Sequence, residues 1–254
     1  MPEEKKNTLI IFDLVATLAN AGPRYAEAFE RVCVQFGVAP PPQEDILGAL
    51  GNKNLKQITD EYAGYLEEDE KRAFMEACNS TCDLMLCDVH WHEALFENVR
   101  PALNILQSQG YVFGIYTGTR DDAMAEQLRY HNISRHFDDR FIRAKNNERD
   151  GMINSDDLKQ AQLSSIVDAY RKESDGTVIV VGDSKSDYVA ASSLGLAFVG
   201  FASCDHAADC LRKAGVHDIF DNFIKLPEMI TQKLSQIVDN KPAGHRSSGP
   251  SIGG

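Results

Sequence analysis

Residues 9–17 of this 254-residue chain read LIIFDLVAT, and this stretch decides the fold. The four consecutive apolar residues at 9–12 are typical of a short strand that is buried on both faces of a parallel sheet. The strand ends at the carboxylate of Asp13. Because ligands of open α/β sheets bind at the carboxyl ends of the strands, Asp13 is predicted to lie where chemistry takes place.

Further strands of this kind follow along the chain, separated by amphipathic helices. Val99, Ala102, Leu103 and Leu106, for example, fall at the i, i+3, i+4, i+7 spacing of one helix face. This alternation predicts βαβ units around a parallel sheet, which is an α/β, Rossmann-like core. The further strands are expected at residues 112–116, 140–143, 178–181, 197–201 and 218–220.

The alternation breaks once, after the first strand. Residues 21–98 contain no convincing strand and are rich in helix formers, whereas a simple crossover needs only about a dozen residues. We therefore expect residues 21–98 to form an inserted all-helical cap domain over the strand ends of a core made of residues 1–20 and 99–240. The tail, residues 241–254, is rich in Gly, Ser and Pro and is predicted to be disordered.

Composition excludes several classes of function. The formal net charge is -12 and no long basic run occurs, which argues against a nucleic-acid surface or an anionic membrane partner. No stretch approaches the roughly 20 apolar residues that span a bilayer, and the first apolar run is too short for a signal peptide. Six cysteines in such a chain favour reduced thiols and a cytoplasmic protein. The oligomeric state stays open.

Polar side chains stand at the ends of three predicted strands. Asp13 ends the first, Thr117 ends the next in GIYTGT, and VVGDSKSD presents Asp183 and Asp187. Each residue alone could be a helix cap, because Asp, Ser and Thr are common at the first position of a helix. Capping does not explain why all of them fall at strand ends of one sheet. We expect these side chains to converge at one edge.

In order and spacing, these residues resemble the motifs of the haloacid dehalogenase-like hydrolase superfamily. The first motif is Asp-x-Asp-x-Thr after a strand, the second a Ser or Thr, the third a Lys some two dozen residues before the fourth, and the fourth Gly-Asp-x-x-x-Asp. The resemblance covers nearly the whole chain, and the predicted insertion matches the helical cap of many members. The matching residues are 13–17, Thr117, Lys159, Gly182, Asp183 and Asp187.

The resemblance implies a chemistry as well as a fold. Asp13 would attack phosphorus and form a covalent aspartyl intermediate. The resemblance implies Mg²⁺ as cofactor, because neutralising charge lets one anion attack another. Thr117 and Lys159 would be catalytic, and Thr17 and the backbone N–H of Gly118 would contribute to substrate binding. The implied metal ligands are Asp13, the backbone carbonyl of Val15, Asp183 and Asp187.

Position 15 departs from the pattern of the family's phosphatases. There the residue is a second Asp, which protonates the leaving oxygen and later activates water, and Val15 does neither. Loss of general acid–base catalysis typically costs about 10²–10⁴-fold in rate. The backbone carbonyl and the nucleophile survive, so metal binding and covalent chemistry remain open. Ala16 replaces the usual Gly, a smaller change that crowds the loop.

Three functions follow from this departure. The first is a hydrolase of small phosphorylated metabolites whose leaving group needs little protonation. The second is carbon–phosphorus cleavage, because the phosphonoacetaldehyde hydrolases of the family resemble this chain in having a small apolar residue at position 15. Such enzymes form an imine on a cap lysine, and Lys53 and Lys56 lie in the corresponding region. The third is a non-catalytic protein that binds phosphate or metal.

Two groups of soft ligands have simpler explanations than zinc. Cys78 and Cys82 are spaced as on one helix face, which favours buried packing over metal binding. Cys210 is predicted to belong to an apolar helical stripe. The neighbouring candidates are Cys87, His90 and His92 in the first group, and Cys204 and His206 in the second.

Overall fold

The computed structural model describes residues 8–50, 53, 55–86, 93–146 and 155–239. All six strands in these ranges are parallel and form one sheet in the order β3-β2-β1-β4-β5-β6. The α/β fold is therefore as predicted, and the tail predicted to be disordered lies outside the described residues. The strands are β1 (Thr8–Asp13), β2 (Val112–Arg120), β3 (Phe137–Lys145), β4 (Thr177–Gly182), β5 (Ala197–Phe201) and β6 (Ile219–Phe220).

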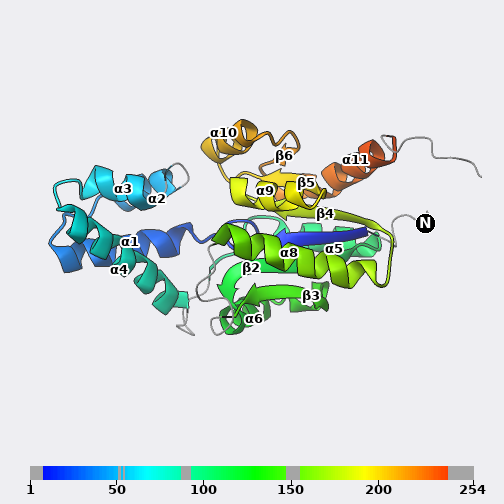
Figure 1. The fold of residues 1–254 in the computed structure, drawn as a ribbon, viewed down its shortest axis with the longest axis horizontal. Helices are drawn as coiled ribbons and strands as arrows, with labels where there is room; N and C mark the ends of the chain where they lie inside the picture. The colour runs from blue at the N-terminus through cyan, green and yellow to red at the C-terminus, as the bar shows by residue number, and fades with distance from the viewer. Residues whose placement is uncertain (1–7, 51–52, 54, 87–92, 147–154, 240–254) are drawn as a thin grey trace, which may run out of the picture.

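Helices cover both faces of the sheet (Figure 1). Alternate residues of β1 divide between the two layers, since Ile10 and Phe12 pack on one side, and Leu9 and Ile11 on the other. All four are fully buried, and each such side chain contributes about 1.5–3 kcal/mol to folding. On the Phe12 side lie α5 (Val99–Ser108), α6 (Asp121–Tyr130) and α11 (Leu226–Asp239); on the other lie α8 (Ser155–Arg171), α9 (Lys185–Ser193) and α10 (Asp205–Ala214).

Between β1 and α5 the described residues form four helices, which we call the helical unit. They are α1 (Gly22–Phe36), α2 (Gln43–Leu50), α3 (Leu55–Tyr62) and α4 (Glu68–Leu86). The unit has an apolar centre of its own, in which the rings of Phe29 and Phe74 lie edge-on at 5.3 Å. Figure 1 shows it beyond the end of the sheet toward which the strands point.

Helix α2 is not predicted by the sequence pattern. Three prolines at 40–42 look like a plain interruption, yet they directly precede a helix, and the carbonyl of Pro42 accepts from the N–H groups of Asp45 and Ile46. Proline suits this position because it lacks the N–H that a first helical turn leaves unpaired. The next helix, α3, ends at Tyr62.

Two chain segments, 14–21 and 93–98, connect the core to the helical unit. They are tied to each other by backbone hydrogen bonds from Asn20 N to Ala94 O (2.8 Å) and from Phe96 N to Leu18 O (3.0 Å). A buried ion pair joins Arg24 of α1 to Glu93 at 2.5 Å. The place where the second connecting segment meets α1 therefore contains an ion pair that is almost fully removed from water.

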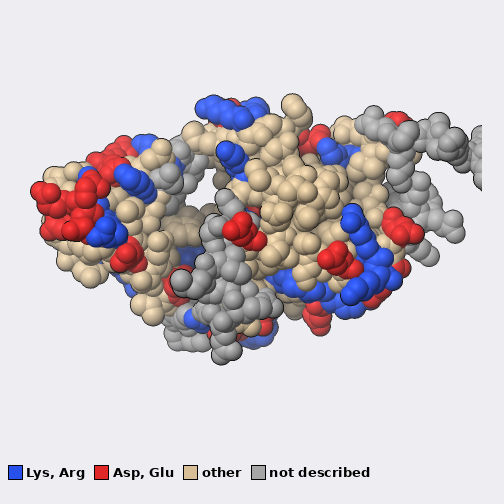
Figure 2. All heavy atoms as spheres, in the orientation of Figure 1, with Lys and Arg blue, Asp and Glu red and all other residues tan. Residues whose placement is uncertain are grey.

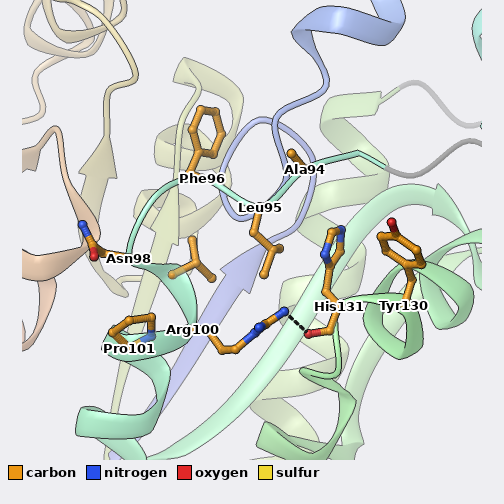
Figure 3. A pocket seen from close by; sticks show the side chains of 9 residues that line it. Ala94, Leu95, Phe96, Asn98, Arg100, Pro101, Tyr130 and His131 are labelled. Atoms are coloured by element: carbon orange, nitrogen blue, oxygen red, sulfur yellow. Dashed lines mark hydrogen bonds between the residues drawn. The ribbon is translucent and has the colours of Figure 1, made fainter.

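A pocket of about 430 Å³ lies beside the second connection. Figure 3 shows that the Arg100 guanidinium reaches across it and donates to the backbone carbonyl of His131 (2.8 Å). The ring Nε2 of His131 in turn contacts the carbonyl of Glu93. These contacts fix the connecting segment 93–98 and the start of α5 against the end of α6.

Hydropathy adds one further observation. Among the residues that the structure describes, no helix is both long enough and apolar enough to cross a membrane.

Candidate active site

Three carboxylates meet at the carboxyl ends of the central strands. Asp13 is the last residue of β1, Asp183 directly follows β4, and Asp187 lies in the first turn of α9. One oxygen from each lies within 4.8 Å of the others. The hydroxyl of Thr17 donates to Asp183 Oδ1 (2.8 Å) and, at a longer 3.4 Å, to Asp13 Oδ2.

The sheet itself brings these acids together. β1 and β4 are neighbours in register, with Phe12 opposite Val181, so that both strands end at the same level. Gly182 then permits the close approach of α9, because a Cβ at that position would lie 2.6 Å from Cβ of Asp187. The glycine of the predicted Gly-Asp-x-x-x-Asp motif is therefore required by packing.

Asp187 is held by hydrogen bonds on both of its carboxylate oxygens. Tyr116 donates its hydroxyl (2.7 Å) and Lys159 its ammonium (2.6 Å) to Oδ1. The backbone N–H of Ser184 (3.0 Å) and its hydroxyl (2.5 Å) donate to Oδ2. A carboxylate has about four acceptor positions, so the protein fills those of Asp187.

Lys159 brings a positive charge to this cluster of acids. Its Nζ lies 2.6 Å from Asp187 and 4.0 Å from Asp13 Oδ1, as expected for the third motif. Burial alone would lower the pKa of Lys159, but the charges of Asp13 and Asp187 outweigh it and raise the pKa above its ordinary value. Lys159 is therefore protonated at neutral pH.

One lysine does not neutralise three acids. Burial, followed by repulsion from Asp187 and Asp183, raises the pKa of Asp13 well above its ordinary value, although Lys159 works in the opposite direction. Burial and Asp187 together raise the pKa of Asp183 to about 6. The cluster as it stands favours an additional positive charge among the carboxylates.

Thr117 and Gly118 follow the end of the β1–β2 pairing, where Asp13 lies opposite Tyr116. The β2 strand itself continues to Arg120 through an irregular register, and so is longer than predicted. The Gln162 side chain fixes the backbone here by donating to the carbonyl of Thr117 (2.9 Å). Apart from the two chain neighbours of Gly118, no atom of the described residues lies within 4 Å of where a Cβ would stand on it, so these residues leave space beside this backbone.

The loop after Asp13 carries the two departures from the family pattern. Val15 is half-buried and packs against the apolar cluster of Phe12 and Leu14. Ala16 has a φ of 64°, in the left-handed region that favours glycine. The structure thus gives a physical reason why Gly is usual at this position.

A cleft of about 1410 Å³ separates the helical unit from the core. Figure 2 shows an opening between the two parts of the molecule. Ala16, Asp183 and Ser184 contribute to its lining, so the acid cluster borders the cleft. Lys53 also lines it and pairs with Glu61 at 2.6 Å, whereas Lys56 pairs with Asp60 and is not part of the lining.

Sequence reasoning missed three residues of this site. In the sequence Tyr116 has the pattern of one more apolar strand residue, and no local signal marks Gln162. Ser184 could have been found, since Ser184 and Asp187 have the spacing of a capping box, which the structure contains.

The cysteine predictions have mixed outcomes. Cys78 and Cys82 are buried, as predicted for packing residues. The prediction that Cys210 belongs to an apolar stripe is wrong: Cys210 is exposed, lines the cleft, and lies 2.9 Å from His206 Nε2. The side chains that α10 buries are instead Ala208 and Leu211. The other candidates of the first group, Cys87, His90 and His92, lie outside the described residues.

The fold is a parallel α/β core with a helical insertion. Three carboxylates and a lysine meet at the strand ends of this core, and this arrangement defines a class of hydrolase. The family model described as haloacid dehalogenase-like hydrolase matches residues 10–201. The chain belongs to this family and is a hydrolase.

Similarity to individual proteins extends over most of the chain. Phosphoglycolate phosphatase from Haemophilus influenzae is 26% identical over 230 residues, which are 86% of this chain and 96% of the relative. The enzyme of the same name from Mannheimia succiniciproducens is 26% identical over 207 residues, covering 76% and 84%.

Solved structures show the same fold. A hydrolase of the haloacid dehalogenase-like family from Streptococcus pneumoniae superposes with a TM-score of 0.65 at 19% identity, covering 89% of this chain and 99% of its own. A predicted phosphoglycolate phosphatase from Haemophilus somnus gives a TM-score of 0.61 at 22% identity, with coverage of 89% and 98%.

Proposed function

We propose that the protein is a Mg²⁺-dependent phosphatase that hydrolyses a small phosphorylated metabolite through an aspartyl-phosphate on Asp13. The observation that carries this proposal is the meeting of Asp13, Asp183 and Asp187 within 4.8 Å, beside the ammonium of Lys159. The relatives named phosphoglycolate phosphatase support a phosphate ester as substrate.

The donor set fits a hard divalent cation. All three side chains offer carboxylate oxygens, the ligands that Mg²⁺ prefers. The raised pKa values of Asp13 and Asp183 reflect crowded negative charge that a cation would relieve. Asp13, Asp183 and the backbone carbonyl of Val15 would hold the ion, and Asp187, whose oxygens are already hydrogen-bonded, would act through water. Such an ion neutralises the charge of the phosphoryl group and of its attacker.

The residues of the chain carry out the other steps of the proposed reaction. A carboxylate oxygen of Asp13 attacks phosphorus, an Asp13–phosphorus bond forms, and the ester oxygen leaves with its electron pair. Water then attacks the same phosphorus, phosphate departs, and the Asp13 carboxylate is regenerated. Thr117, Gly118 and Lys159 bind the phosphoryl oxygens, while Thr17 holds Asp183 in place.

Val15 sets the kind of leaving group. With no carboxyl at position 15, the leaving oxygen receives no proton from that side chain. An acyl phosphate, an anhydride or an aryl phosphate loses a weakly basic oxygen, which needs no such help. We therefore expect these substrates to be turned over faster than simple alkyl phosphates, by an amount that approaches the roughly 10²–10⁴-fold of general acid catalysis.

The helical unit would act as a cap. In this proposal the cap comprises residues 21–98 and is inserted in a core made of residues 1–20 and 99–240. The cleft between the helical unit and the core supports this division. Closure of such a unit excludes water from the acids and presents side chains to the leaving group. Lys53, which lines the cleft, is the one of the two predicted cap lysines that lies in reach of a bound molecule.

The contacts of Lys53 argue against carbon–phosphorus cleavage through an imine. An imine forms from the neutral amine, but the hydrogen bond from Lys53 to Glu61 raises the pKa of this lysine and holds it protonated. Borohydride with a phosphonate aldehyde tests this alternative, and we expect no covalent label on Lys53.

An activity assay separates a phosphatase from a non-catalytic binding protein. We expect the wild type to hydrolyse acetyl phosphate and p-nitrophenyl phosphate only when Mg²⁺ is present. Asp13→Asn abolishes this turnover, and Val15→Asp gains activity on alkyl phosphates. Asp168→Asn, at an exposed site on α8, is the matched control and keeps wild-type rates. Turnover that survives Asp13→Asn, or no turnover in either wild type or Val15→Asp, would contradict the proposal.

A further inference from the structure

The two walls of the cleft differ in chemistry. The wall formed by the helical unit is largely apolar and aromatic. The wall formed by the core carries basic side chains from α9 and α10. The first wall includes Tyr25, Phe29, Leu47, Leu55, Cys78 and Cys82, and the second includes Lys185, His206 and Lys213 together with the acids Asp183 and Asp205.

The part of the core wall that belongs to α10 is one continuous face of this helix. His206, Cys210, Lys213 and Ala214 follow one another at i, i+4, i+7 and i+8, and all four line the cleft. Figure 2 shows Lys and Arg side chains gathered over α10, next to the opening. The helix is fixed from behind by Leu211, which is buried in the core, so this face is presented in a defined direction.

Lys185 extends the same wall toward the acid cluster. It is the first residue of α9, two positions after Asp183, and α9 and α10 pack against each other. The wall therefore begins beside the proposed phosphoryl site and runs outward along α10.

Neither Lys185 nor Lys213 forms an ion pair with a described residue. Within the described part of the chain, no acidic side chain lies within 4.0 Å of the ammonium of Lys185 or Lys213, whereas the neighbouring Arg212 pairs with Asp209 at 2.7 Å. The chain as a whole has a formal net charge of -12. Two unpaired cations on the wall of a cleft in such an acidic protein favour an anionic ligand there.

We propose that the substrate carries a second anionic group, a carboxylate or a second phosphate, which binds to Lys213 and Lys185 on the α9–α10 wall. The apolar middle of the molecule lies against Tyr25 and Phe29, and the phosphoryl group to be cleaved lies at Asp13. This inference rests on the proposed function, since it specifies the substrate of the same site. The volume of about 1410 Å³ accommodates such an elongated molecule, because pockets for small molecules measure about 300–1,000 Å³.

Binding of non-hydrolysable phosphonates tests the inference without depending on turnover. In the presence of Mg²⁺, titration calorimetry compares 3-phosphonopropanoate and propane-1,3-bisphosphonate with propylphosphonate, which has no second anion. We expect at least one of the two dianion-bearing ligands to bind roughly tenfold more tightly than propylphosphonate, the gain of one charge-assisted contact. Whether the carboxylate or the second phosphonate gives the larger gain identifies the second group.

Two lysine variants show which residue is responsible for the gain in affinity. Lys213→Gln should remove most of it while leaving the affinity for propylphosphonate and the melting temperature unchanged, because Lys213 is exposed. Lys172→Gln, at an exposed lysine in the turn after α8 and outside the cleft lining, is the matched control and keeps the gain in affinity.

The outcomes separate the two proposals. If propylphosphonate binds and p-nitrophenyl phosphate is hydrolysed, but a second anion adds no affinity or Lys213→Gln does not remove it, the inference is overturned and the proposed function stands. If none of the phosphonates binds and no phosphate ester is hydrolysed, both fail together.

Discussion

The hydroxyl of Thr17 donates a 2.8 Å hydrogen bond to Oδ1 of Asp183, although the two residues stand 166 positions apart in the chain. The bond joins the loop after β1 to the loop after β4, so the two central strands share one polar network at their carboxyl ends. Thr17 is fully buried. Its hydroxyl therefore holds an acid in the position from which a cation would be bound.

Replacing Thr17 by Val should uncouple these loops. Valine keeps the shape but removes the donor, and a lost hydrogen bond to a charged group costs about 1.5–3 kcal/mol. We expect Mg²⁺-dependent turnover to fall by about tenfold or more, with the free energy of unfolding reduced by that cost. Thr17→Ser keeps the hydroxyl and should stay within a few-fold of wild type in the same phosphatase and urea-unfolding assays. A Thr17→Val enzyme that matches wild type would show that the bond is dispensable.

Ala16 offers a substitution that stabilises the fold. A left-handed φ of 64° costs an alanine about 1–2 kcal/mol, which glycine avoids at an entropic cost of about 0.4–1 kcal/mol in the unfolded chain. We expect Ala16→Gly to raise the free energy of unfolding by about 0.5–1 kcal/mol. The control is Ala28→Gly, in the interior of α1, where glycine should destabilise by about 0.5–1 kcal/mol. If both variants lower the melting temperature, the strain at Ala16 is not real.

Lys159→Met should make the protein depend on Mg²⁺ for stability. Removing the ammonium leaves three acids without their neighbouring positive charge, and breaking a buried ion pair costs about 3–5 kcal/mol. A divalent cation replaces part of that charge. In thermal melts we therefore expect Mg²⁺ to raise the melting temperature of Lys159→Met by more than it raises that of wild type. Lys172→Met should respond to Mg²⁺ as wild type does, and an equal response in Lys159→Met would argue against the shared charge.

His136 should make the fold sensitive to mild acid. Burial, with the charges of Arg135 and Arg100, lowers the pKa of His136 in the folded state. At this group the unfolded chain binds more protons than the folded chain once the pH drops below about 6.5, so the contribution of His136 to the free energy of unfolding falls with pH from there downward. Asp183, whose pKa is raised to about 6 in the folded protein, contributes in the opposite direction, so the effect of His136 is the difference from a variant that lacks it. Urea unfolding at pH 7.5 and 5.5 measures this loss.

The His136→Gln variant identifies the residue responsible. It should lose less stability than wild type between the two pH values, since the group that takes up the extra proton on unfolding is gone. His217→Gln, at an exposed histidine, should keep the wild-type dependence. Equal losses in all three proteins would assign the acid sensitivity elsewhere.

The parts of the fold that depend on local pattern could be predicted from the sequence. Runs such as 9–12 and 178–181 lie in β1 and β4, and their final acids meet because parallel neighbours end at one edge. Lys159 could be assigned only through the family resemblance, since a lysine on a helix carries no local signal, yet it lies 2.6 Å from Asp187.

What the sequence could not show arises from tertiary packing. The phenol of Tyr116 looked like one more apolar strand residue, because only the placement of α9 puts Asp187 next to it. Cys210 fits the apolar spacing of α10 about as well as Leu211 does, and only the docking of the helix decides which of them faces the core. The basic wall of the cleft was missed for the same reason.

Titration of Mn²⁺, a spectroscopic substitute for Mg²⁺, tests most directly whether the acids share one cation. Electron paramagnetic resonance should report one bound ion per wild-type chain, with affinity at least tenfold weaker in Asp183→Asn and unchanged in Asp168→Asn. A wild-type protein that binds no ion saturably, or an Asp183→Asn variant that binds as tightly as wild type, would contradict the account.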